Sequence, residues 1–132
     1  MSKMEKISVE SKQREELVEI TRQIKSAVRN LQIQDGSIIV YVPHTTAGVV
    51  INESADPSVG KDIVNYLGKM IPKNSNYLHT EGNSDAHIKA SILGNSQIIP
   101  ISDGDIVLGT WQGIFFAEFD GPRSRKVLVG KS

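Results

Sequence analysis

Three histidines are the side chains of this sequence with the widest chemical range: His44, His79 and His87. Each has small polar neighbours, in a predicted loop or at the end of a predicted element, and none falls within an apolar stripe. A neutral imidazole can bind a metal ion, hold a phosphate or move a proton. One histidine alone is usually a bystander, but three in similar surroundings favour a shared site. We therefore predict that all three are catalytic and that together they could bind a divalent metal ion.

The first histidine follows Pro43 at the end of a predicted strand and precedes Thr45 and Thr46. A strand end fixes the backbone, and an imidazole with two hydroxyls can bind phosphate, a metal ion or a polar ring. A plain turn into the next strand explains the same residues equally well. Thr45 and Thr46 are candidate substrate-binding residues.

Two histidines, two acidic residues and an asparagine are concentrated between His79 and His87. His87 is predicted in the first turn of a short helix, whose positive end favours an anion and disfavours imidazolium. Such a histidine is a good metal ligand or general base, although the spacing matches no standard zinc motif. A polar capping loop is an equally good interpretation. Asn83, within this loop, is a candidate substrate-binding residue.

Two glutamates are candidate catalytic residues. Glu53 lies between a predicted strand and helix and has no capping role, because Asp56 is the expected cap, so Glu53 could orient a histidine or take a proton. Glu118 shares a strand face with Gln112, and an acid in such an apolar strand is costly to bury unpaired. We expect Glu118 to pair with arginine or histidine in the site, or to lie at its rim, and Gln112 to contact substrate.

A basic turn follows the last predicted aromatic strand and contains Arg123, Arg125 and Lys126. The two guanidinium groups could hold a phosphate by paired hydrogen bonds. A basic cluster at a hairpin tip is more often there for solubility. Both interpretations stay open, with Arg123 and Arg125 as candidate substrate-binding residues.

Composition narrows the possible binding partners and cellular compartments. The length of 132 residues suits one domain, which we take as residues 1–132. Lysine plus arginine equals aspartate plus glutamate, at 15 each, so neither nucleic acid nor a membrane surface is an expected partner. Cysteine is absent, and we find no apolar run that suits a secretory signal or a membrane span. The cytoplasm is the expected compartment.

Apolar spacing and turn residues predict the elements that position these side chains. We predict strands over residues 3–10, 37–42, 48–52, 97–101, 105–108, 113–119 and 126–129, and helices over 17–31 and 57–71, with a short one capped by Ser84 or Asp85 and ending at Gly94. Two hairpins are expected, around Asp103-Gly104 and around Asp120-Gly121-Pro122. The predicted class is α+β: one compact domain with a mainly antiparallel sheet, two longer helices and one short helix.

Aromatic residues suggest self-association. Trp111, Phe115, Phe116 and Phe119 fall in one β segment, where alternation places them on both faces. A small subunit has difficulty covering both faces alone, so we expect one of them to meet a second copy, with Trp111 as a packing or interface anchor.

The segment from Ser96 to Ile114, SQIIPISDGDIVLGTWQGI, is similar to the signature of the YjbQ family, also described as secondary thiamine-phosphate synthases. Its long, specific spacing argues against chance. Further matches cover essentially the whole chain: Pro43-His44-Thr45-Thr46-Ala47, Asn52-Glu53, His79 with Glu81-Gly82-Asn83, Ala86-His87-Ile88, and Asp120 with Arg123 and Arg125.

The resemblance implies a YjbQ-like α+β subunit that assembles as a homotrimer, with polar sites near subunit boundaries. It also implies a reaction that joins hydroxymethylpyrimidine pyrophosphate to a thiazole phosphate and releases pyrophosphate. The arginines and a divalent cation, zinc or magnesium, would assist the leaving group. His44 or His87 would protonate it or bind phosphate, oriented by Glu53 or Glu118. Two alternatives are a non-enzymatic trimer that binds a metal or phosphate ligand, and a metal-assisted phosphate-ester hydrolase.

Overall fold

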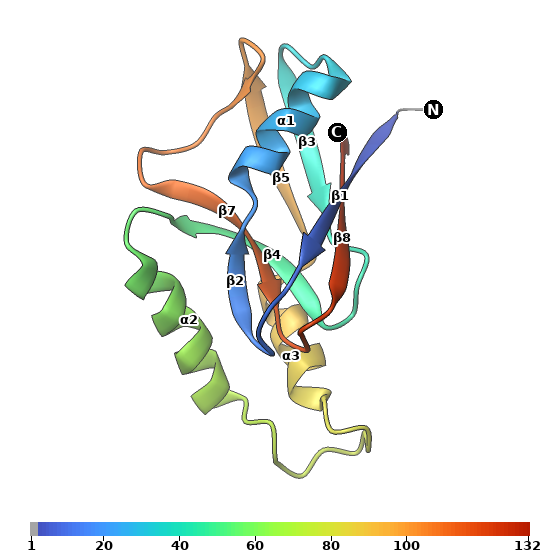
Figure 1. Cartoon of the computed structure of the whole chain (residues 1–132), viewed down its shortest axis with the longest axis vertical. Helices are drawn as coiled ribbons and strands as arrows, with labels where there is room; N and C mark the ends of the chain where they lie inside the picture. Colours follow the sequence, from blue (N-terminus) through green and yellow to red (C-terminus); the bar gives the residue numbers. More distant parts are fainter. Residues whose placement is uncertain (1–2) are drawn as a thin grey trace.

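The computed structural model describes residues 3–132, which form two antiparallel sheets and three helices (Figure 1). The strands are β1 (Met4–Glu10), β2 (Glu16–Glu19), β3 (Gly36–Tyr41), β4 (Ala47–Glu53), β5 (Ser96–Ser102), β6 (Asp105–Ile106), β7 (Gln112–Glu118) and β8 (Ser124–Lys131). The helices are α1 (Thr21–Leu31), α2 (Pro57–Met70) and α3 (Ser84–Leu93). The predicted α+β class is confirmed. Residues 1 and 2 of the predicted domain lie outside the described residues.

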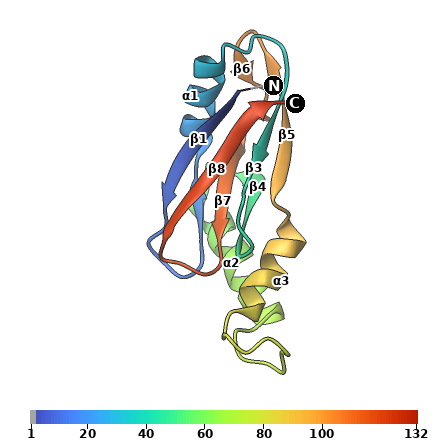
Figure 2. The ribbon, with the colours of Figure 1, turned by 90° about the vertical axis from the view of Figure 1, so that its right-hand side faces the viewer.

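The five-stranded sheet has the order β1-β8-β3-β5-β6, and the three-stranded sheet has the order β2-β7-β4. The main core lies between the inner faces of the two sheets and α1, and it includes the fully buried Ile24, Val40 and Phe116. A second, smaller core joins α3 to the other face of β7, through Ala86, Ala117 and Phe119 among others. The helices α1 and α3 therefore lie at opposite ends of the molecule (Figure 2).

The chain changes sheet between β7 and β8, and this corrects the predicted second hairpin. β7 pairs with β2 and β4, whereas β8 pairs with β1 and β3 in the other sheet. The turn at Gly121 is tight, because a Cβ there would lie 2.5 Å from the carbonyl oxygen of Gln13. Turn residues predict where a chain reverses, but not which strand it meets next. The change of sheet places the end of β7 against the start of β8.

The predicted hairpin around Asp103-Gly104 is confirmed as β5–β6, with Ile101 paired to Ile106. Asp103 and Gly104 have φ angles of 52° and 76°, the left-handed pair that a tight two-residue hairpin turn requires. β6 ends after Ile106, earlier than predicted.

The predicted helix over 17–31 is wrong in its first turn, because residues 16–19 form β2 and α1 begins at Thr21. Leu17 and Val18 pair with β7 and point to opposite sides: Val18 packs on the main core and Leu17 on the smaller one. A four-residue segment is too short for its apolar spacing to distinguish a period of 2 from one of 3.6. Sheet pairing decides the outcome here.

Helix α2 begins as predicted. Asp56 accepts a hydrogen bond from the backbone N–H of Ser58 at 2.9 Å, and Pro57 follows as the first helical residue. No side chain of α2 is fully buried, so the helix lies on the outside of the three-stranded sheet (Figure 1). Within residues 3–132, we find no helix with the length and apolar character needed to cross a membrane.

Candidate functional site

His44 lies just beyond β3, and its ring is fixed by the start of β8. The backbone N–H of Lys126 donates to its Nε2 at 3.0 Å. Burial lowers the pKa of His44 below its ordinary value, and the nearby Arg125 lowers it further. A neutral ring that accepts at Nε2 carries its proton on Nδ1. His44 can therefore offer Nδ1–H to a ligand.

The other two histidines are in contact with each other. The rings of His79 and His87 meet edge to face, with 5.4 Å between their centroids and 80° between their planes. His79 lies in the loop before α3, and its Nδ1 is 3.1 Å from Oγ of the buried Ser84. His87 lies in α3, close to its start, as predicted. His87 is thus carried by α3, and His79 contacts α3 through Ser84.

A shallow hollow of about 500 Å³ connects His44 to His87. Thr45 also lines it, and the remaining lining residues come from β4, α3 and the turn after α3: Ala47, Ala90, Ser91, Gly94 and Asn95. His44, Thr45, His79 and His87 are called the histidine surface below. The structure thus brings two predicted histidines to one hollow and the third into contact with one of them.

The arrangement of the three histidines bears on the predicted metal site. Among residues 3–132, no three histidine, aspartate or glutamate side chains gather closely enough to hold a metal ion. The Nε2 of His44 is occupied by a backbone N–H, which leaves a donor rather than a lone pair on its other nitrogen. The predicted ligand set of His44, His79 and His87 does not fit a divalent ion in this arrangement, so we derive no chemical step through one.

Arg123 and Asn83 meet at Asp120, beside the loop that carries His79. Arg123 donates from Nη2 to Oδ2 of Asp120 at 3.1 Å and from Nε to the Asp120 carbonyl at 2.8 Å. Nδ2 of Asn83 donates to the same Oδ2 at 2.8 Å, while its buried Oδ1 has no hydrogen-bond partner. A buried acceptor without a partner is uncommon in folded proteins. The side chain of Arg123 is 52% exposed and so accessible to a ligand.

Glu118 pairs with an arginine, as predicted. It is fully buried at the end of β7 and accepts from Nε of Arg125 at 2.8 Å and from Nη2 of the same residue. Burial raises the pKa of Glu118, but the hydrogen bonds from Arg125, the Asp120 N–H and Ser11 outweigh it and lower the pKa overall. The ion pair joins the two sheets where the chain passes from one to the other.

Arg125 differs from its neighbour Arg123, because it is only 4% exposed. Besides binding Glu118, it donates to Oγ1 of Thr46 at 2.8 Å. Thr46 is itself buried and precedes β4. The basic turn therefore has one exposed guanidinium and one that links β7, β8 and the start of β4.

Two predicted site residues lie away from the histidines within the chain. Glu53 ends β4 opposite Gln112, while Ala47, at the start of β4, is opposite Glu118. Six residues of strand separate these ends by about 20 Å. The Glu53 carboxylate accepts from the N–H of Ala55 at 3.1 Å, and the Gln112 amide accepts from the N–H of Gly109 at 2.8 Å. Neither contacts the histidine surface.

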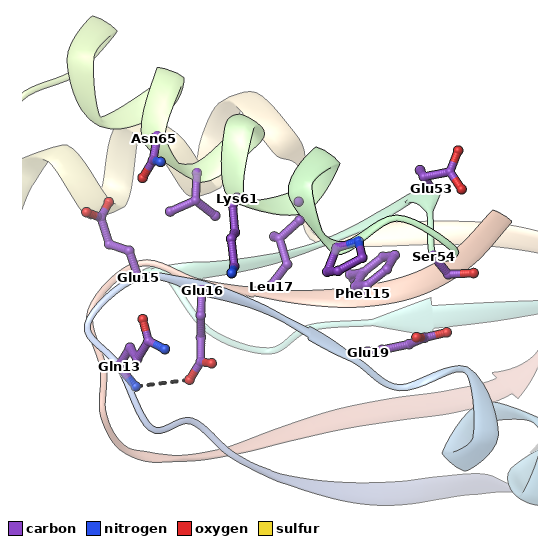
Figure 3. Close-up of a pocket in the computed structure, with 13 residues that line it drawn as sticks. Gln13, Glu15, Glu16, Leu17, Glu19, Glu53, Ser54, Lys61, Asn65 and Phe115 are labelled. Atoms are coloured by element: carbon purple, nitrogen blue, oxygen red, sulfur yellow. Dashed lines mark hydrogen bonds between the residues drawn. The ribbon is translucent and has the colours of Figure 1, made fainter. Parts of the chain in front are cut away.

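Glu53 instead lines a second hollow, of about 520 Å³, between α2 and β2 (Figure 3). Leu17, Val64 and Phe115 make its apolar part, and Lys61 lies on the α2 side. Four glutamates surround it: Glu15, Glu16, Glu19 and Glu53. Each has hydrogen bonds within the chain, for example from the N–H of Gln13 to Glu16 at 3.0 Å. These contacts explain the positions of the four carboxylates, so no ligand has to be invoked for them.

A buried group of charges beneath α3 was not predicted. Asp85, expected as a possible helix cap, is instead fully buried; Asn83 is the N-cap residue, without a side-chain cap bond. Asp85 binds Arg14, at 3.2 and 3.0 Å, and Lys89, at 2.9 Å. Burial raises the pKa of Asp85, but these two cations outweigh it and lower the pKa overall. The Asp85–Lys89 spacing of four residues hinted at a helical ion pair, but no local pattern pointed to Arg14.

The chain is thus a small α+β protein, in which two antiparallel sheets meet at a buried Glu–Arg pair. The family model described as "UPF0047 protein YjbQ-like" matches residues 5–131. The chain belongs to this YjbQ/UPF0047 family, which confirms the resemblance found in the sequence.

Several relatives share sequence or fold with this chain over most of their length. A UPF0047 protein of Methanocaldococcus jannaschii is 60% identical over 124 residues, which is 94% of this chain and 90% of the relative. YugU of Bacillus subtilis is 42% identical over 124 residues, 93% of this chain and 94% of the relative. A crystal structure from Clostridium acetobutylicum has a TM-score of 0.94 at 50% identity and covers 97% of this chain and 99% of its own. A structure from Sulfolobus solfataricus, described as a YbjQ-like protein of unknown function, has a TM-score of 0.93 at 32% identity, with 99% and 96% coverage.

Proposed function

We propose that the chain is a thiamine-phosphate synthase whose histidine surface binds the phosphorylated reactants. The observation that carries the proposal is the neutral His44, which offers Nδ1–H at a hollow shared with His87. Anions bind well where N–H donors are fixed in place at a hollow. The family resemblance supplies the reaction, which joins hydroxymethylpyrimidine pyrophosphate to a thiazole phosphate.

In the proposed step, the bond from the pyrimidine methylene carbon to oxygen breaks, and the thiazole nitrogen forms a new bond to that carbon. Pyrophosphate leaves with the electron pair of the broken bond and needs stabilising as its charge develops. His44 stabilises this charge by hydrogen bonding, because proton loss from a neutral imidazole is unfavourable. His87 is the candidate acid, because a bound pyrophosphate favours the imidazolium that the start of the helix disfavours. Arg123 holds a terminal phosphate. Glu118 and Arg125 act by fixing the turn, since they are buried against each other.

Replacing Arg123 by lysine tests the phosphate site. Lysine keeps the charge but loses the paired hydrogen bonds, so we expect pyrophosphate affinity to fall by roughly 1–3 kcal/mol while the melting temperature barely moves. Calorimetric titration with pyrophosphate, and separately with thiamine phosphate, measures the change. Arg22→Lys, on the exposed side of α1, is the matched control. Equal affinity in wild type and Arg123→Lys would show that the turn does not bind phosphate.

Self-association remains part of the proposal, although the aromatic argument for it weakens. Phe116 and Phe119 are fully buried within their own chain. Of the four aromatic residues in this segment, Trp111 alone is strongly exposed, at 63%. A better surface is the outer face of the five-stranded sheet, where Ile98 is 61% exposed, Ile39 lies directly opposite it on β3, and Met4 on β1 is 43% exposed. Alternation directs these side chains away from the core. Such a patch supports contact with a second copy.

We expect light scattering at micromolar concentration to give three times the 14.5 kDa chain mass, the trimer that the resemblance implies. Ile98→Asp would place a charge in the contact and reduce the mass toward that of one chain. Tyr66→Asp, an equally exposed position on α2, is the control. A monomeric wild type would contradict the assembly, and dissociation by Tyr66→Asp alone would place the contact on α2.

A cytoplasmic location and a divalent ion, zinc or magnesium, stay predictions of the sequence. No step above depends on the ion. The two other functions remain alternatives: a binding trimer without turnover would use the same histidine surface, and a metal-assisted hydrolase would need ligands beyond the three histidines of one chain. Product analysis distinguishes the three functions. A synthase forms a carbon–nitrogen bond, a hydrolase releases free phosphate, and a binding protein converts no substrate.

A further inference from the structure

Helix α3 is held in place by charged side chains as well as by the smaller apolar core. Its buried residues are Ser84, Asp85, Ala86, Lys89 and Ala90, so none of them is a large apolar side chain. Most helices in globular proteins are fixed by an apolar stripe, which resists removal from the core but allows small rotations. Polar contacts therefore contribute to the position of α3 beside its small apolar residues.

Four residues form these contacts, and they are called the ion cluster: Arg14, Glu15, Asp85 and Lys89. Asp85 is fully buried and Lys89 is 1% exposed, and their side chains are 2.9 Å apart. Arg14 binds both carboxylate oxygens of Asp85, and Lys89 also binds Glu15. Arg14 and Glu15 come from the segment between β1 and β2. Two positive and two negative charges thus join α3 to a distant part of the chain.

The ion cluster and His87 occupy opposite sides of the same helix turn. Asp85 and Lys89 are four residues apart and share one face, whereas His87, two residues from each, projects about 200° around the axis from Asp85. Ser84, next to Asp85, is the residue that contacts His79. Asp85 and Lys89 are two anchored points on one face of α3, and together they fix its rotation about the helix axis. This rotation sets the direction of His87 and the position of Ser84, which contacts His79.

We infer that Arg14 and Lys89 are positioning residues, which orient α3 so that His87 faces the hollow next to His44 and His79 stays in contact with His87. The inference rests on the proposed function for the identity of the ligand. The orientation of the His79 and His87 rings can be tested without that ligand. Paired hydrogen bonds between a guanidinium and a carboxylate fix angles as well as distances, which an apolar contact of the same area does not. Neither positioning residue lines the hollow.

Arg14→Met is the direct test, because the Arg14 side chain is 27% exposed and its loss leaves Asp85 paired with Lys89. We expect the imidazole signals of His79 and His87 in nitrogen–proton spectra to shift and broaden. Pyrophosphate affinity is expected to fall between about 10-fold and 100-fold, the range known for residues that orient metal ligands from behind. Arg14→Lys, which keeps the charge, is expected to recover part of both losses.

The matched control is Ile24→Ala, which creates a cavity in the main core and leaves α3 untouched. It destabilises the protein without moving the histidine signals or the pyrophosphate affinity. Unchanged signals and affinity in Arg14→Met would overturn the inference. Equal changes in Ile24→Ala would also overturn it, because the ion cluster would then contribute only to the overall stability of the protein. If Arg14→Met does not fold, Arg14→Lys against Ile24→Ala gives the same comparison. A wild type that does not bind pyrophosphate would refute the proposed function, while the ring signals would still decide the positioning role.

Discussion

Arg125→Met is expected to lower the free energy of unfolding by about 3–5 kcal/mol, because it leaves a buried carboxylate without its cation. Glu118 is fully buried and has two of its hydrogen bonds from Arg125. Ser11 and the N–H of Asp120 would still donate to Glu118, but neither carries a charge. Urea denaturation followed by circular dichroism measures the loss. A loss below about 1 kcal/mol would mean that water or another residue replaces the guanidinium.

Two further variants separate the charge effect from lost packing. Glu118→Gln combined with Arg125→Met removes both charges and is expected to be more stable than Arg125→Met alone. Lys25→Met breaks an exposed pair, in which Lys25 and Asp105 are 3.9 Å apart, and is expected to change stability by less than about 1 kcal/mol. A double variant no more stable than Arg125→Met would show that packing dominates.

The pH dependence of stability follows from the pKa of Glu118. In the native protein this pKa lies below the ordinary 4.5, so the stabilisation is fully present above pH 4.5 and is lost as the pH falls through the folded pKa. In Arg125→Met, burial remains and the main counterion is gone, which raises the pKa of Glu118. The penalty of this variant is then largest at neutral pH and shrinks in acid. Denaturation curves measured from neutral pH to below pH 4.5 would test this. The free energy of unfolding is expected to fall with decreasing pH in the wild type and to rise in Arg125→Met.

His87→Ala is expected to lower kcat of the proposed synthase by at least about 100-fold, the usual contribution of a positioned acid or base. His44→Ala is expected to act mainly on pyrophosphate affinity, because the Nδ1–H of His44 serves as a hydrogen-bond donor to the phosphate. The assay measures pyrophosphate release and thiamine phosphate formation with both reactants present. The two variants thus distinguish the step that each imidazole serves.

Asn65→Ala is the control, because Asn65 lies on α2 at the hollow shown in Figure 3, away from the histidine surface. Full turnover in both histidine variants would exclude the histidine surface as the catalytic site. A wild type that binds pyrophosphate but forms no product would instead support the binding-protein alternative.

Local chemistry was enough to predict several features that the structure contains. Asp56 followed by proline begins a helix, and Asp103-Gly104 makes a tight hairpin, because each depends on a few adjacent residues. The cost of burying an unpaired acid was enough to predict that Glu118 has a basic partner. The long signature segment identified the family.

Other features depend on residues far apart in the chain, which no local pattern contains. Leu17 and Val18 form a strand because β7 is available to pair with them, although their spacing also suits a helix. β8 joins the opposite sheet from β7 because its apolar residues fit the core from that side. Arg14 meets Asp85 across 71 positions of sequence. Such contacts require the whole chain to fold, since their free energy comes from burial that only the assembled core provides.

For the site, residue types and their places at element ends were determined by the sequence, including His44 after a strand and His87 near the start of a helix. The tertiary structure decided which of them meet. It separated the two arginines of the basic turn, one exposed and one buried, and placed Glu53 and Gln112 at the far end of a sheet from the histidines. It also added the ion cluster beneath α3. The physical reason is that an ionisable group's role depends on its distance to other charges and to water, and both are set by the packing of the sheets and α3.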